Sequence, residues 1–292
     1  MRSSVHRGPK RRSAALLGVN AGLCILAAAA LLGACGQQEN APPGPSASPS
    51  PSASYATSLT AVERNWLTEH GALEVGAFND YPPFGFVDAN GQAVGLAVDY
   101  WNLVAERLGV QVTFTPVLFA EQLEGLKQGR FDTLQGIFPL AERKQWFAFS
   151  RAYFAIDTRI YTDASHANLT SLKALRGAEG VSVAVVDGDS GQEIADKAGL
   201  ITLVVAGYPQ AVMAVASGSA QAMVLDEMVA DYYIEQFKVG AQVKPVGKAV
   251  ASGLMTMPVR KGDTVLLGIL NKGIELVGEH EFEGIYESWM GQ

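Results

Sequence analysis

Cysteine and histidine are scarce in this chain of 292 residues, which contains two cysteines and four histidines. Both cysteines, Cys24 and Cys35, lie in the first 35 residues, which excludes an intramolecular disulfide and a thiolate metal site from the rest of the chain. The histidines are scattered, and the sequence contains no HExxH, no phosphate-binding loop and no recognisable Ser-His-Asp set. We therefore expect a protein without a metal ion or cofactor.

Positive charge is also sparse beyond the amino terminus. The five basic residues among the first 35 leave 17 Lys and Arg against 29 Asp and Glu, a net charge of −12 for the remainder. Such a surface repels nucleic acid and anionic lipid headgroups. Nucleic acid is therefore not an expected partner.

One long apolar run, from Ala14 to Leu32, follows a basic segment that ends at Arg12. The run is as long as a short membrane span, so a retained transmembrane anchor is one interpretation. The sequence LGAC at residues 32–35 favours another, because small residues before a cysteine are typical of a lipoprotein signal peptide. Residues 1–34 would then be removed, and Cys35 would carry the lipid. The adjacent Arg11 and Arg12 are not followed by the hydrophobic continuation of a good twin-arginine signal, which favours export by the general secretory route.

A segment rich in Pro, Ser, Ala and Gly follows, at residues 35–58. It has almost no bulky apolar side chain to bury, so we predict a disordered tether that holds a domain of residues 59–292 away from a membrane. At the start of that domain, Thr60 and Glu63 have the spacing of a capping box and predict a short helix.

Residues 59–292 alternate between strand and helix patterns. Leu73–Phe78 alternates apolar and other residues as a half-buried strand does, and Val98, Trp101 and Leu108 recur at helical spacing before Gly109. Further strands are predicted at 110–114, 131–137 and 155–161, and helices at 120–127 and from residues 191, 209 and 227. The alternation predicts an α/β fold with a parallel sheet.

Several stretches resemble, in order and spacing, the family 3 extracellular solute-binding proteins: VGAFNDYPPFGFVDANGQAVGLAVDYW, LKQGRFDTLQGI, FAFSRAYF and AVASGSAQAMVLDE. The sensor domains of bacterial hybrid histidine kinases are more similar still. The resemblance implies a two-lobed type II periplasmic-binding-protein, or Venus flytrap, fold. It places lobe 1 at about 71–157 plus 256–292 and lobe 2 at about 158–255, joined by two hinge crossovers, with the ligand in the cleft.

The resemblance also assigns roles to individual residues. Arg143 would grip a ligand carboxylate, Asp226 would receive an ammonium group, and Ser190 would contribute to carboxylate binding at a helix start. Tyr81 and Phe119 would be aromatic cleft walls. The other interpretations are a solvated turn charge for Arg143, helix capping for Asp226 and Ser190, and core packing for the aromatics.

Two departures from the family bear on the ligand. Phe138 and Leu140 stand where the family usually has small hydroxyl residues, and Phe78 replaces the acid that holds a cationic side chain. Phe138 would therefore line the site without donating to the ligand. We expect a smaller or more apolar carboxylate, such as an aromatic one, and not arginine, lysine or histidine.

The resemblance implies a monomeric, extracytoplasmic lipoprotein that captures an amino acid or related acid and delivers it to an ABC transporter permease. The alternative is a ligand-sensing module that acts on a membrane signalling partner. A dehydratase of cyclohexadienyl acids shares the fold, and it would need a general acid such as Asp226 or Glu227. We expect no enzymatic activity.

Overall fold

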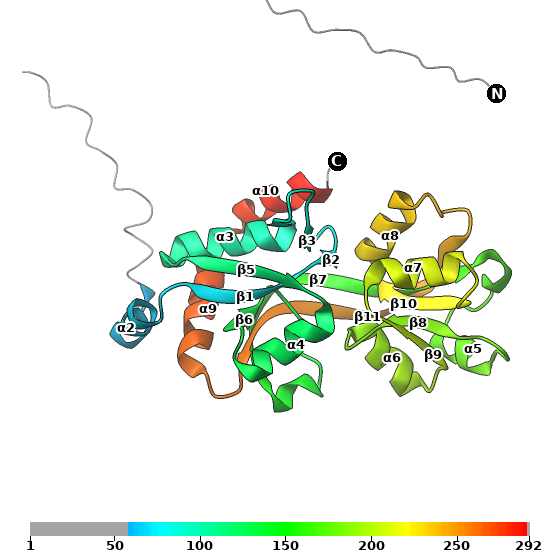
Figure 1. The fold of residues 1–292 in the computed structure, drawn as a ribbon, viewed down its shortest axis with the longest axis horizontal. Coiled ribbons are helices and arrows are strands. Elements are labelled where there is room, and N and C mark those ends of the chain that lie inside the picture. Colours follow the sequence, from blue (N-terminus) through cyan, green and yellow to red (C-terminus); the bar gives the residue numbers. More distant parts are fainter. Residues whose placement is uncertain (1–57, 291–292) are drawn as a thin grey trace, which may run out of the picture. The chain divides into compact units, whose positions relative to one another are not determined.

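The computed structural model describes residues 58–290 (Figure 1). The predicted signal peptide (1–34), Cys35 and almost all of the predicted tether (35–58) lie outside the described residues, so those predictions stay predictions. Within residues 58–290, no helix combines the length and the apolar composition needed to cross a bilayer.

The first lobe is built on a three-stranded sheet with the order β5-β1-β6. The central β1 (Leu73–Phe78) pairs in parallel with β5 (Val112–Val117) and with β6 (Thr133–Leu134). The strand predicted at 131–137 is shorter than expected, because Ile137 leaves the sheet and bridges Thr256 instead. A second, antiparallel sheet carries the aromatic loop after β1, in the order β2 (Asp80–Tyr81), β3 (Gly85–Val87) and β4 (Ala93–Val94).

Five α-helices complete the first lobe as the structure describes it: α2 (Ala61–His70), α3 (Leu96–Leu108), α4 (Phe119–Gln128), α9 (Thr264–Leu276) and α10 (Glu279–Met290). The capping box of Thr60 and Glu63 is confirmed at the start of α2. Trp101 of α3 is fully buried, and its Nε1 donates a hydrogen bond to the Gln135 carbonyl at 2.8 Å. This bond ties α3 to the chain that leaves β6.

The second lobe contains a five-stranded sheet with the order β11-β7-β10-β8-β9. Its shorter strands, β8 (Val183–Val186), β9 (Thr202–Val205) and β10 (Ala222–Asp226), lead into α6 (Ser190–Ala198), α7 (Tyr208–Ala216) and α8 (Glu227–Gln236), as predicted. α5 (Leu172–Gly177) precedes them. The expectation of a parallel sheet is confirmed for β10, β8 and β9 and wrong for the rest of this sheet, because β7 runs antiparallel to both β10 and β11.

Two long strands connect the lobes. β7 (Phe147–Asp163) and β11 (Val243–Arg260) lie side by side and antiparallel (Figure 1), from Phe147 opposite Arg260 to Asp163 opposite Val243. Their register shifts between Val246 and Ala251 and again at Thr256. The crossovers that the resemblance implies, near residues 155–161 and 254–259, lie within these strands, and the two-lobed α/β fold is confirmed. The lobe limits stay predictions.

Candidate functional site

Arg143 begins a short 3-10 helix, η2 (Arg143–Gln145), and its side chain is buried. Nη1 donates to the Phe138 carbonyl at 3.0 Å, and Nη2 donates to the Gly188 carbonyl of the second lobe at 2.9 Å. The guanidinium carbon lies 5.3 Å from the centre of the Phe119 ring. The interpretation of Arg143 as a solvated turn charge is therefore wrong. Burial lowers the pKa of Arg143 from its ordinary value, and nearby Asp189 opposes this effect.

Asp226 ends β10 and is 1% exposed. It occupies the N-cap position of α8, but its side chain makes no capping hydrogen bond. Instead, the Tyr81 hydroxyl donates to Oδ2 and the Thr158 hydroxyl donates to Oδ1, both at 2.6 Å. Because Tyr81 belongs to the first lobe, this carboxylate connects the lobes. Burial raises the pKa of Asp226 to about 7.

Ser190 does not form the capping box that its spacing to Glu193 predicts. The N-cap of α6 is Asp189, Ser190 is the first helical residue, and no side chain caps this helix start. The Ser190 hydroxyl is buried and has no hydrogen-bond partner in the described part of the chain. The capping interpretation is wrong because the helix begins one residue earlier than the pattern indicates.

Aromatic side chains surround these polar groups. Phe78 stacks on Tyr81 with ring centres 4.5 Å apart and faces Phe119 at 5.9 Å. The Phe138 ring packs against Gly253 of β11, where a Cβ atom would lie 2.4 Å from it. Phe138 therefore occupies space that a larger residue at 253 would take, and it presents carbon, not a hydroxyl, to the site.

The structure brings five predicted site residues to one inner cavity between the lobes: Tyr81, Phe119, Phe138, Arg143 and Asp226. Ser190 does not line it. The free volume of the inner cavity is about 10 Å³, room for about one water molecule. An amino acid can enter only if the lobes separate or the side chains move.

Sequence reasoning missed two polar residues that line the inner cavity, Asp189 and Tyr208, and also Asp80, which contacts Tyr208. The Tyr208 amide donates to Asp80 Oδ2 at 3.2 Å across the lobes, and burial raises the pKa of Asp80 to about 6. Burial also raises the pKa of Asp189, although the nearby Arg143 guanidinium lowers it. A usable signal existed, because Asp189 follows the end of β8 as Asp226 ends β10, and ligands bind at the carboxyl ends of such strands.

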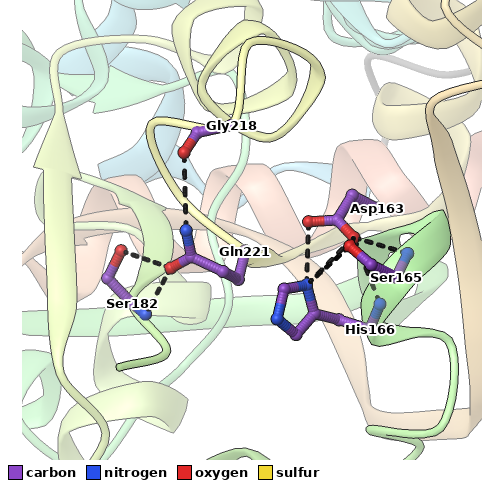
Figure 2. A network of polar contacts seen from close by, with 6 residues as sticks. All are labelled: Asp163, Ser165, His166, Ser182, Gly218 and Gln221. Carbon is purple, nitrogen blue, oxygen red and sulfur yellow. Dashed lines mark hydrogen bonds and ion pairs between the residues drawn. The ribbon is translucent and has the colours of Figure 1, made fainter. Parts of the chain in front are cut away.

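A Ser-His-Asp group lies elsewhere in the second lobe (Figure 2). Asp163 Oδ1 accepts from the Ser165 hydroxyl at 2.6 Å and from the Ser165 amide at 2.8 Å, and Asp163 Oδ2 lies 2.9 Å from His166 Nδ1. The same view shows Gln221 accepting from the Ser182 amide at 2.9 Å. Because the Ser165 hydroxyl lies 2.6 Å from Asp163 Oδ1 but 3.5 Å from His166 Nδ1, the serine donates to the carboxylate, and the group caps the short helix η3 (Ala164–His166) without an activated nucleophile.

Comparisons with known proteins identify the family of this chain. The model of the bacterial extracellular solute-binding proteins, family 3, matches residues 73–292. The chain is 24% identical over 242 residues to the virulence sensor protein BvgS of Bordetella pertussis, covering 80% of this chain and 19% of BvgS, so it spans about a fifth of that relative. It is 25% identical over 231 residues to the L-cystine-binding protein TcyJ of Escherichia coli, covering 78% of this chain and 85% of TcyJ.

A solved structure agrees at the level of the fold. The crystal structure of a histidine kinase sensor domain with similarity to periplasmic binding proteins superposes with a TM-score of 0.71 at 26% identity. The match covers 75% of this chain and 96% of the sensor domain. With the family model covering most of its length, the chain belongs to the bacterial extracellular solute-binding proteins of family 3.

Proposed function

We propose that this protein is an extracytoplasmic solute-binding lipoprotein that captures a small carboxylate-bearing ligand and delivers it to an ABC transporter permease. The ligand is an amino acid or a related acid. One observation carries the proposal: Arg143, from the first lobe, and Asp226, from the second, line the same buried cavity, which has aromatic walls.

The bonds already present at the two charged groups indicate how a ligand would be held. A ligand carboxylate would replace the Phe138 and Gly188 carbonyls at the Arg143 guanidinium, where two parallel N–H donors match two oxygens. A ligand ammonium would replace the Tyr81 hydroxyl at Asp226. Since such a ligand contacts both lobes, it stabilises the arrangement in which they touch.

Ligand binding should make the protein more compact in solution. Without ligand we expect the lobes to separate along the hinge strands β7 and β11, because the inner cavity must open to admit a ligand. Small-angle scattering should therefore give a smaller radius of gyration at saturating ligand than without it, and no change for Arg143→Ala. An identical profile with and without ligand would contradict ligand-driven closure.

The direct bonds between the lobes favour a second candidate function, ligand sensing through a membrane signalling partner. The Tyr81 hydroxyl reaches Asp226, and the Tyr233 hydroxyl donates to the Asp80 carbonyl at 2.8 Å, so the chain's own groups link the lobes. A resting state with touching lobes suits a sensor whose ligand changes that contact. An unchanged scattering profile and a kinase gene beside this one would favour sensing, whereas a permease gene favours transport.

Lipid attachment at Cys35 is the second part of the proposal, supported by the sequence LGAC after the apolar run. Cys35→Ser should leave an unlipidated precursor that keeps its leader or is cleaved at another site. Mass spectrometry of the mature wild-type protein should find diacylglycerol on an amino-terminal Cys35. A wild-type protein that begins elsewhere and carries no lipid would rule out this anchor.

We propose no catalytic activity for this cleft. Of the two acids that a dehydratase-like reaction could use, Asp226 lines the inner cavity, but both its oxygens accept hydroxyl hydrogen bonds. Glu227 does not line the cavity and is paired with Arg159 at 2.8 Å. This arrangement suits binding of a cationic group better than proton transfer to a ligand.

A further inference from the structure

A larger pocket, here called the outer pocket, lies beside the inner cavity. This outer pocket has a volume of about 440 Å³ and is lined from both lobes: by α4, η2 and Trp146 on one side and by α6 and the loop before it on the other. Arg143 and Asp189 border both the outer pocket and the inner cavity. Its volume is sufficient for a small organic molecule.

Asp189 is the unexplained group of the outer pocket. The residue is 6% exposed, and its Oδ2 atom is buried without a hydrogen-bond partner anywhere in residues 58–290. A buried carboxylate oxygen without a hydrogen-bond partner is costly even with the Arg143 guanidinium nearby, so a group that donates to it would bind favourably. This is the chemistry expected of a ligand that carries an ammonium or guanidinium group.

The cations that line the outer pocket are already engaged. Arg143 donates to two backbone carbonyls, as described above. Lys197 pairs with Glu142 at 3.1 Å and also with Glu193, and Lys127 pairs with Glu124 at 3.6 Å. A ligand carboxylate in the outer pocket would therefore have to displace one of these existing bonds, whereas an ammonium group would meet Asp189 Oδ2 without displacing any.

Two further features suit a ligand with two positive ends. Asp196 lines the pocket from α6, seven residues after Asp189, and makes no ion pair in the described chain. Seven residues of α-helix rise by about 10 Å, which is the separation expected between the two acids along the helix. Trp146 is 51% exposed, and Lys127 Nζ lies 5.4 Å from the centre of its ring, so the indole already receives a cation.

We propose that the outer pocket binds an organic cation without a carboxylate, an amine or guanidine compound with one charged end on Asp189, its second charge toward Asp196 and its chain against Trp146. The proposal is independent of ligand capture in the inner cavity, because it uses neither Asp226 nor a free Arg143. It also explains why an acid stands at the N-cap of α6, facing the cleft between the lobes.

The test is calorimetric titration of the purified full chain with agmatine, which has a guanidinium and an ammonium group, and with arginine, which adds a carboxylate. Agmatine should bind wild type, and the affinity for arginine should be lower by about tenfold or more. Asp189→Asn should weaken agmatine binding by about tenfold or more. Asp187→Asn, which removes an exposed acid outside the pocket, should leave it unchanged.

A second variant does not depend on a buried residue. Because Trp146 is exposed, Trp146→Ala should fold normally. The variant should bind agmatine about two- to fivefold more weakly, which corresponds to about 0.5 to 1 kcal/mol for a lost cation–π contact. The proposal is overturned if wild type does not bind agmatine or if Asp189→Asn binds it as tightly as wild type. It is also overturned if Asp226→Asn abolishes binding and Asp189→Asn does not, since agmatine would then occupy the inner cavity and not the outer pocket.

Discussion

Arg143→Ala should remove most of the protein's affinity for a carboxylate ligand, a loss of about 2 to 5 kcal/mol, or roughly 30- to 5,000-fold. The side chain is buried and lies at the inner cavity opposite Asp226, so the variant would leave a ligand carboxylate buried without a partner. The measurement is calorimetric titration with a panel of amino acids, aromatic carboxylates and dicarboxylates.

Two matched variants sharpen this prediction. Arg143→Lys keeps the positive charge but loses the planar pair of donors, so its affinity should fall between those of wild type and Arg143→Ala. Asp226→Ala should be as harmful as Arg143→Ala if the ligand has an ammonium group, and harmless if the ligand is an acid without one, as Phe138 indicates. If Arg143→Ala binds a panel member as tightly as wild type, the assigned carboxylate clamp is wrong.

Trp101→Ala should destabilise the folded protein by about 3 to 5 kcal/mol, a large part of the roughly 5 to 15 kcal/mol typical of a domain. The indole is fully buried in the first lobe, and the substitution removes both its packing and its hydrogen bond to the Gln135 carbonyl. Chemical denaturation of wild type and variant gives the difference.

Trp101→Phe is the control for this second prediction. It keeps an aromatic ring but removes one of the two donors to the Gln135 carbonyl, which still accepts from the Tyr153 hydroxyl at 3.1 Å, so it should cost about 0.5 to 1.5 kcal/mol, less than the alanine variant. Equal losses for the two variants would show that the hydrogen bond dominates. A loss below about 1 kcal/mol for Trp101→Ala would contradict the role given to this residue in the core.

The elements that short-range patterns specify are the ones that the sequence predicts well. The capping box at Thr60, the alternation of β1 and the helix that stops at Gly109 each depend on a few neighbouring residues. The length of β7 and β11 and the early end of β6 depend on pairing between residues 80 or more positions apart, such as Asp163 with Val243 and Ile137 with Thr256. No local pattern contains that information.

The same distinction applies to the site. Arg143 and Asp226 could be assigned by resemblance, but the hydrogen bond from Tyr81 to Asp226 joins residues 145 positions apart and is visible only in the structure. The sequence does not single out Asp189, because the spacing of Ser190 and Glu193 predicts a capping box that does not form. Its significance depends on burial without a partner, which the sequence cannot show.

The central claim is that one ligand is held between Arg143 and Asp226. It is tested most directly by thermal unfolding of wild type and of the double variant Arg143→Ala/Asp226→Ala with each compound of the panel. At 100 times its dissociation constant, a ligand of the inner cavity should stabilise wild type by about 2.7 kcal/mol and should leave the double variant unchanged. Equal stabilisation of both proteins, or none of wild type by any member of the panel, would contradict the account.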